Sequence, residues 1–134
     1  MANTNYYTSS STSEAAGTSI CPSNWHLPSS NGTTKEYGAL STSYGGTGSN
    51  QSGTANAGDI MSNRFRTFPN NFLYSGYFYG SSAFNRGTSG YYWSRSAFSN
   101  YGYSYNLGLN SAYLYPSDNY SKNSGFSVRC LIGS

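Results

Sequence analysis

The residues of this chain that could do chemistry are few. The acids are Glu14, Glu36, Asp59 and Asp118, the single histidine is His26, and the two cysteines are Cys21 and Cys130. A catalytic pair needs a base within hydrogen-bond reach of a nucleophile, and this set offers little to build one from. We interpret His26, in the segment Trp-His-Leu-Pro, as structural, and Asp59 as a helix N-cap. We therefore expect no enzyme and no catalytic residue.

Metal and cofactor sites are not expected either. The sequence has no Cys-x-x-Cys pair, so it lacks the usual spacing of a zinc site. Hard cations such as calcium prefer several carboxylate oxygens, which four scattered acids do not offer. We expect no metal ligands and no cofactor.

The cysteines allow two interpretations. Cys130 stands in the run Gly-Phe-Ser-Val-Arg-Cys-Leu-Ile, whose alternation predicts a half-buried strand. Its side chain should then point inward with those of Phe126, Val128 and Ile132. A disulfide with Cys21 would close a loop of about 110 residues and stabilise the fold by ~4–5 kcal/mol. Two separate buried thiols are the alternative. A disulfide would indicate an oxidising, extracytoplasmic setting.

Aromatic residues gather in 72–120, where 16 of them accompany only three charged residues, Arg86, Arg95 and Asp118. The rest of the stretch is mainly Ser, Gly and Asn. Tyrosine gives a large contact area at low entropic cost, and Ser, Gly and Asn give adaptable hydrogen bonds. This composition predicts a binding surface.

Length and charge limit the structural class and the partners that the chain could have. A chain of 134 residues suits one domain, and its 18% aromatic content argues against disorder although only 8% of residues are charged. The net charge of +3 comes without a basic run, so we expect no nucleic-acid partner. No apolar segment is long enough to insert into a membrane. The N-terminal residues lack the pattern of a signal peptide, so we expect an excised domain or another export route.

The elements that must position these residues follow from periodicity. Residues 1–18 are expected to form an arm. Thr33 and Glu36 have capping-box spacing before Tyr37, Leu40 and Tyr44, which predicts a helix over 34–43. A second short helix is predicted over 59–65. Strands are predicted over 72–79, 90–97, 101–109, 112–115 and 125–132. Two short helices followed by several short antiparallel strands indicate an α+β fold.

Either face of the strand predicted over 101–109 could be the one that contacts a ligand. Tyr101, Tyr103 and Tyr105 alternate with smaller residues and continue to Leu107 and Leu109. These tyrosines either contact a ligand or pack in the interior. If they pack inside, the opposite face becomes the expected exposed patch: Ser104, Asn106, Gly108 and Asn110.

Four segments carry a resemblance to a known family. They are Ile-Cys-Pro-Ser-Asn-Trp-His-Leu-Pro-Ser-Ser (20–30), Asn-Asn-Phe-Leu-Tyr-Ser-Gly-Tyr-Phe-Tyr-Gly-Ser-Ser (70–82), Gly-Tyr-Tyr-Trp-Ser-Arg-Ser-Ala-Phe (90–98) and Gly-Phe-Ser-Val-Arg-Cys (125–130). Together they resemble the Fibrobacter succinogenes major paralogous domain of bacterial surfaces, over residues 19–132. The resemblance implies a C-type-lectin-like fold in one domain, 19–134, with adjacent N- and C-termini. It also supports the bridge between Cys21 and Cys130.

The chain also resembles the variable proteins of diversity-generating retroelements, which use the same scaffold and vary mainly at Asn codons. This resemblance implies a ligand-binding set drawn from 79–124, to which we add Arg86 as a candidate hot spot beside Arg95. The expected residues are Tyr79, Phe84, Asn85, Arg86, Tyr92, Arg95, Phe98, Asn100, Tyr101, Tyr103, Asn106, Asn110, Tyr113, Tyr120 and Asn123.

The function expected from all this is ligand binding in adhesion or receptor recognition. The partner would be a protein or glycan on another cell or on a phage host. The domain would act outside the cell or on its surface, as a monomer. The alternative is a structural subunit of a surface filament or layer, in which the same aromatic face packs on a copy of itself.

Overall fold

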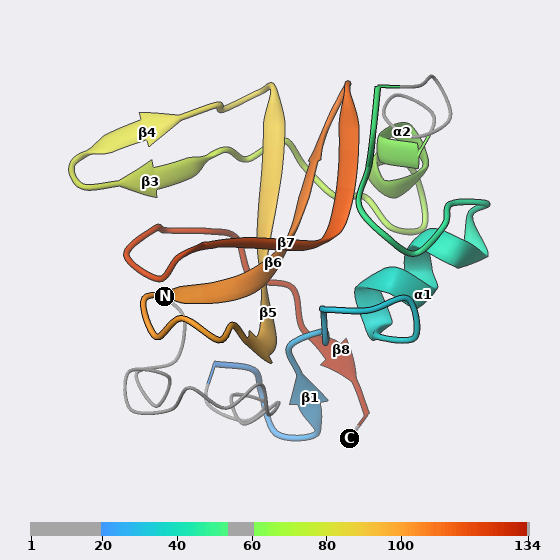
Figure 1. Cartoon of the computed structure of the whole chain (residues 1–134), viewed down its shortest axis with the longest axis horizontal. Coiled ribbons are helices and arrows are strands. Elements are labelled where there is room, and N and C mark those ends of the chain that lie inside the picture. The colour runs from blue at the N-terminus through green and yellow to red at the C-terminus, as the bar shows by residue number, and fades with distance from the viewer. Residues whose placement is uncertain (1–19, 54–60, 134) are drawn as a thin grey trace.

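The strands form three small antiparallel sheets beside two short helices (Figure 1). The computed structural model describes residues 20–53 and 61–133. The elements are β1 (Trp25–His26), α1 (Glu36–Ser43), β2 (Gln51–Ser52), α2 (Met61–Arg66), β3 (Tyr77–Tyr79), β4 (Ser82–Phe84), β5 (Ser89–Ala97), β6 (Tyr103–Asn110), β7 (Tyr113–Ser121) and β8 (Leu131–Ile132). The main sheet has the order β2-β7-β6-β5, and β1-β8 and β3-β4 are separate pairs. The expected α+β class is confirmed. The predicted arm, 1–18, lies outside the described residues.

The main sheet is buried on both faces. The helices cover one face, where Tyr37 of α1 and Phe65 of α2 join a core from the strands. The rest of that core is Phe72, Tyr92, Leu107, Leu109 and Leu114. Successive residues of a strand point to opposite faces, so Tyr91 and Trp93 lie on the other side. There they pack with Phe126, and Tyr77 and Tyr120 complete this second cluster.

Helix α1 spans 36–43, so it ends where the sequence predicts but begins two residues later than the predicted 34–43 and with a different cap. The backbone N–H of Glu36 donates to the Ser29 hydroxyl at 3.0 Å, and the Ser29 N–H donates to the Glu36 carboxylate at 2.7 Å. This reciprocal pair does what a capping box does, with Ser29 in the place expected of Thr33. The second helix spans 61–66 rather than 59–65, and Asp59 lies outside the described residues.

Several strand predictions were wrong in extent. Only 77–79 of the predicted 72–79 is a strand, and only 131–132 of 125–132. Strand β7 runs to 121 because a register shift against β6 accommodates Pro116, which would otherwise interrupt the ladder. Strands β1, β2 and β4 were not predicted, since two or three residues carry no periodicity.

Two predictions about strand faces were also wrong. Ser104, Asn106 and Gly108 are buried, because β6 lies between β5 and β7 and the aromatic cluster covers that face. Near the C-terminus, Val128 and Ile132 are exposed rather than inward, because 125–130 forms no regular strand. It joins the fold instead through isolated bridges from Gly125 to Phe78 and from Ser127 to Tyr92.

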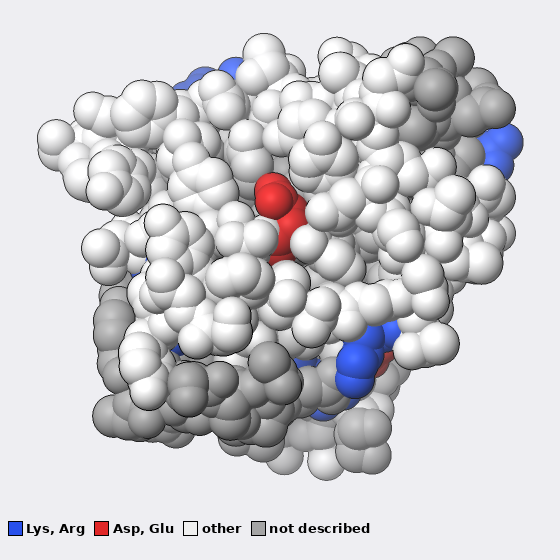
Figure 2. Space-filling view, viewed as in Figure 1, with Lys and Arg blue, Asp and Glu red and all other residues white. Residues whose placement is uncertain are grey.

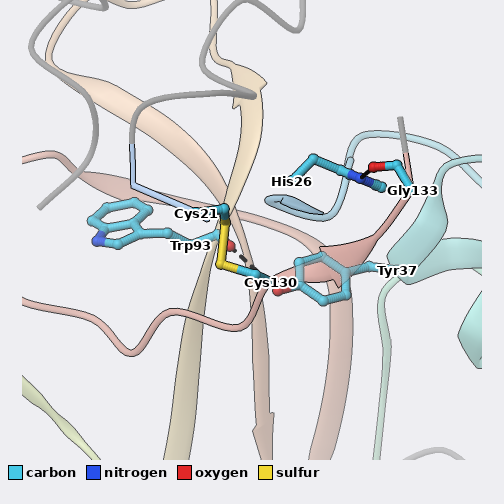
Figure 3. Close-up of a disulfide and its surroundings, with 6 residues drawn as sticks. All are labelled: Cys21, His26, Tyr37, Trp93, Cys130 and Gly133. Carbon is cyan, nitrogen blue, oxygen red and sulfur yellow. Dashed lines mark hydrogen bonds between the residues drawn. A yellow bond between two sulfur atoms is a disulfide. The ribbon is translucent and has the colours of Figure 1, made fainter. Parts of the chain in front are cut away.

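A disulfide joins Cys21 to Cys130, which confirms the expected pairing (Figure 3). Next to it, β1 pairs with β8, and His26 donates from Nδ1 to the Gly133 carbonyl at 2.6 Å. The first and last described segments are thus side by side. A disulfide of this kind points to an oxidising environment.

Candidate functional site

An aromatic groove of about 350 Å³ lies between the β3-β4 hairpin and the ends of β6 and β7. We call this the aromatic groove; its lining is Tyr77, Tyr79, Phe84, Tyr103, Asn119, Tyr120 and Ser121. No residue of the lining carries a formal charge. The hairpin projects from the body of the molecule (Figure 1). The lining residues place one wall of the groove on the hairpin and the other on β6 and β7.

Tyr77 holds the hairpin in place. Its ring packs edge-on against Tyr91, Tyr120 and Phe126, with centroids 5.1, 5.5 and 5.8 Å away. Its hydroxyl accepts a hydrogen bond from the Tyr120 hydroxyl at 3.2 Å. Such edge-to-face pairs each contribute about 0.5–1.5 kcal/mol beyond buried area. The inner wall of the groove is therefore rigid.

The backbone fixes the hairpin as well. The Phe78 N–H donates to the Gly125 carbonyl at 3.0 Å, and the Gly125 N–H donates back at 2.7 Å. Gly76 enters the hairpin with φ +68°, and a Cβ there would lie 2.2 Å from the Phe84 carbonyl oxygen. Only glycine fits this close approach of two chain segments.

The outer wall is exposed. Tyr79 and Phe84 are 52% and 42% exposed, and Tyr103 adds an exposed ring at the start of β6. The hydrogen bond with Tyr77, and then burial, raise the pKa of Tyr120 to about 12, so its hydroxyl stays protonated at neutral pH. The groove thus offers ring faces and neutral hydroxyl and amide groups to a ligand.

Beside the groove, three residues on neighbouring strands make what we call the polar floor: Asn106, Gly108 and Asp118. Asn106 faces Asp118 across the β6-β7 ladder. A Cβ at Gly108 would lie 3.1 Å from the Asp118 Oδ2 and 3.8 Å from the Asn106 Nδ2. A side chain at Gly108 would therefore crowd the Asp118 carboxylate, beside which the buried Asn106 amide nitrogen also lies.

Asp118 is the acid of this floor. Burial raises its pKa, and hydrogen bonding to the Asn119 backbone and the Asn106 amide opposes that rise. The Asn119 N–H donates to Oδ1 at 2.9 Å, whereas the Asn106 amide nitrogen is near but makes no hydrogen bond of standard geometry. Figure 2 shows acidic atoms alone in the middle of a nearly uncharged face, over the strands that carry Asp118.

The structure brings four of the predicted residues together in the aromatic groove: Tyr79, Phe84, Tyr103 and Tyr120. Asn106 lies in the polar floor, and Tyr113 borders it, with its ring 3.5 Å from the position of a Gly108 Cβ. Burial, and then the Tyr91 hydroxyl at 3.3 Å, raise the pKa of Tyr113. Asn85 donates to the same Tyr91 hydroxyl at 3.2 Å.

Other predicted residues lie apart or inside. Tyr92 is in the helix-side core, with its hydroxyl on the Leu73 backbone. Arg95 lies near Glu36, at 3.7 Å, and Phe98 packs on Tyr103 and Tyr105. The turn residues Asn100 and Asn110 accept backbone N–H groups with their side chains. The predicted residues Arg86, Tyr101 and Asn123 are exposed outside the groove lining.

Sequence reasoning missed Tyr77, Asn119, Ser121 and Asp118, and it named Gly108 only in the alternative exposed patch of the 101–109 strand. Tyr77 could have been found only from the three-dimensional packing that makes it the centre of a cluster. Asp118 could have been noticed from the sequence, because it is the sole acid in the aromatic stretch 72–120. An isolated acid among rings is often functional when it is also partly buried.

A second hollow, of about 390 Å³, lies beside α1. It is mainly apolar, with Tyr37, Leu40, Phe72 and Leu131 in its lining, and the Arg129 guanidinium stands 4.4 Å over the Phe72 ring. None of the residues predicted for ligand binding lines it. In the described ranges, no three His, Cys, Asp or Glu side chains gather as metal ligands. No helix there is long and apolar enough to cross a membrane.

The fold and site define an α+β domain with an uncharged aromatic groove. A family model described as a domain of unknown function (DUF8237) matches residues 50–131. This is more than half of the chain, which therefore belongs to that family. The matched region contains β3 to β7 and so the whole aromatic groove. No curated protein and no solved structure matches the chain.

Proposed function

We propose that this chain is a non-enzymatic ligand-binding domain that holds a protein ligand against the aromatic groove. The observation that carries the proposal is the gathering of Tyr79, Phe84, Tyr103 and Tyr120 around one groove, from the β3-β4 hairpin, β6 and β7. Tyrosine is enriched where proteins bind proteins, because its ring is large, stiff and amphipathic. The rigid packing of Tyr77 supports the proposal too, since a preformed site loses less entropy on binding.

The proposal extends to the setting. We infer that the domain is displayed outside the cytoplasm on a C-type-lectin-like scaffold. Its joined ends support this inference, because a disulfide and the β1-β8 pair leave the aromatic half free for display. We further infer that groove positions such as Tyr79 and Tyr103 are diversified by a retroelement. Sibling genes that differ at these codons, next to a reverse transcriptase gene, are the expected finding; invariant codons contradict it.

The experiment is a screen with matched variants. The purified domain is tested against arrays of extracellular proteins and of glycans, and each binder is retested with the double variant Tyr79→Ser/Tyr103→Ser. Trp25→Ser is the control, because Trp25 is 42% exposed but belongs to β1 and not to the groove. We expect a protein ligand whose affinity falls at least tenfold in the double variant and is unchanged in the control. Equal binding by all three, or binding to glycans alone, would contradict the proposal.

Self-association is the second candidate function. Every residue of β4 is exposed, so the hairpin presents a free strand edge that a second copy could extend. Sedimentation over a hundredfold range of concentration separates the two functions. A constant monomer favours the binding domain, and open-ended growth that Phe84→Ser abolishes favours the filament subunit.

A further inference from the structure

We propose that the hollow beside α1 binds a small organic acid, in which a free carboxylate is attached to an apolar body. The hollow has a volume of about 390 Å³ and lies between α1, residues 70–72 and residues 129–131. Its lining shares no residue with the lining of the aromatic groove. The inference therefore goes beyond the proposed function and does not depend on it.

The walls of the hollow suit the apolar body of such an acid. Tyr37 and Phe72 are 1% and 4% exposed and belong to the core, which holds both rings in place. The Tyr37 hydroxyl also donates to the Trp93 carbonyl at 3.3 Å (Figure 3). Leu40 and Leu131 are less buried and add aliphatic side chains nearer the solvent. A site with preformed walls loses little entropy when it binds a ligand.

Arg129 brings a positive charge to these walls. Its guanidinium carbon stands 4.4 Å from the centre of the Phe72 ring, a cation–π contact that holds it beside the hollow. Within the described residues, the guanidinium makes no hydrogen bond and no ion pair. Its N–H donors are therefore available to a ligand. A planar guanidinium matches a carboxylate especially well, because the two can form parallel hydrogen bonds.

A second donor at the hollow is also unsatisfied. The Asn70 Nδ2 is buried and has no hydrogen-bond partner among the described residues. Buried amides are almost always paired in folded proteins, and each exception calls for an explanation. Asn70 lies two residues before Phe72, whose ring carries the Arg129 contact. A ligand carboxylate that accepts from both side chains would satisfy two donors that the fold leaves unpaired.

The hollow also contains an acid, Glu36, but its charge is already compensated. The Glu36 Oε1 lies 2.5 Å from the His26 Nε2, and the Glu36 Oε2 accepts the Ser29 N–H at 2.7 Å. The same Oε2 lies 3.7 Å from the Arg95 guanidinium. In the lining of the hollow, Arg129 is thus the charged side chain without a counter-charge. The ligand that supplies one is an anion.

The size of the hollow favours a free small molecule over a segment of a protein. Small-molecule pockets range from about 300 to 1,000 Å³, so this hollow is near the lower limit of that range. A stable protein partner needs roughly 800 Å² of contact on each side, which a hollow of this size does not supply by itself. We therefore assign it to a small acid.

The test uses hydrocinnamate, which joins a carboxylate to one aromatic ring by a short chain. It is titrated into the isotope-labelled full chain, with hydrocinnamamide as the uncharged match and acetate as the match without an apolar body. We expect hydrocinnamate to shift the Leu40 and Leu131 methyl signals and the Asn70 side-chain NH₂ signals in nuclear magnetic resonance spectra. The binding should weaken with added salt. Hydrocinnamamide and acetate should each bind at least tenfold more weakly.

Matched variants test whether Arg129 holds the carboxylate. Arg129→Gln removes the charge, so it should weaken hydrocinnamate binding at least tenfold and abolish the preference for the acid over the amide. Arg66→Gln is the control, because Arg66 stands 3.7 Å over the Tyr74 ring in a similar contact but lies outside the hollow. It should bind hydrocinnamate as the native chain does. Equal binding of acid and amide to the native chain, or unchanged binding in Arg129→Gln, would overturn the inference.

Two further results distinguish this site from the aromatic groove and from a site for protein chain ends. Tyr79→Ser/Tyr103→Ser should bind hydrocinnamate unchanged, because neither residue lines the hollow. A tenfold loss in that variant would mean that the probe binds in the groove, which would overturn the inference. The peptide Gly-Gly-Gly-Phe carries the same ring beside a free carboxylate. If it binds at least tenfold more tightly than hydrocinnamate, the ligand is the carboxyl terminus of a protein and the assignment to a small acid is wrong.

Discussion

Cys21 and Cys130 are covalently joined with their Cα atoms 5.8 Å apart, although 109 residues separate them in sequence. The loop they close contains both helices and nearly all of the sheet. Because the bridge restricts the unfolded chain, its effect grows with the length of that loop.

The first prediction concerns this bridge. The double variant Cys21→Ser/Cys130→Ser should lose about 4–5 kcal/mol of unfolding free energy in the loop-entropy model. Denaturant unfolding measures the loss, and a reducing agent should destabilise the native chain while leaving the double variant unchanged. A loss below about 1 kcal/mol would show that the β1-β8 pair alone joins the ends.

The second prediction concerns pH. Both ring nitrogens of His26 face acceptors, the Gly133 carbonyl and the Glu36 carboxylate, so only the doubly protonated ring donates to both. The hydrogen bond with Glu36 raises the pKa of His26 above its ordinary 6.5, although burial and Arg95 oppose the rise. Burial raises the pKa of Glu36, but hydrogen bonds from His26 and Ser29 outweigh it and leave that pKa below 4.5.

These directions fix the pH window. The folded pKa of His26 is raised, so its stabilisation is complete below about pH 6.5 and is lost as the pH rises through the folded value. The folded pKa of Glu36 is lowered, so its stabilisation is present above its ordinary value and is lost on acidification. Unfolding free energy measured against pH should decline on the alkaline side in the native chain. His26→Gln should lack this decline; an identical alkaline slope in both chains would contradict the assignment.

Helices and strands were predicted best where interactions between neighbouring residues determine them. Tyr37 and Leu40 lie at helical spacing after a polar cap, and the helix forms there although Ser29 supplies the cap. The strand of β6 was also predictable from its alternation. Its faces were not, because alternation assumes one wet face, whereas the aromatic cluster around Phe126 buries the second face.

The candidate site was predictable only in composition. The sequence identifies a stretch rich in tyrosine but cannot say which rings meet, because the groove depends on how Tyr77 packs between the hairpin and the sheet. Tyr92 shows the limit most clearly. It neighbours Tyr91 in sequence, yet one strand places the two rings on opposite faces of the sheet.

The third prediction compares two glycines of the hairpin. Gly80→Ala should cost about 1–2 kcal/mol, the ordinary cost of left-handed backbone, because a Cβ there has nothing within 4 Å. Gly76→Ala should cost more, because its Cβ would overlap the Phe84 carbonyl and push β4 away. Hydrogen exchange of the Phe78 N–H reports on the hairpin and should accelerate strongly in Gly76→Ala alone. Equal exchange in both variants would show that Gly76 does not hold the groove together.

The last prediction concerns the charge of Asp118. Burial raises its folded pKa, so the native chain binds this proton more tightly than the unfolded chain does, and stability falls as the pH rises past about 3.8. Asp118→Asn removes the buried charge and can keep the hydrogen bond from Asn119, so it should raise the melting temperature at pH 7. At pH 3, where the carboxyl is protonated, the native chain and the variant should melt together. A residue kept only for the fold would give the opposite result, a variant less stable at neutral pH. A gain in stability at neutral pH would instead mean that the ionised, partly buried carboxylate costs the folded protein stability.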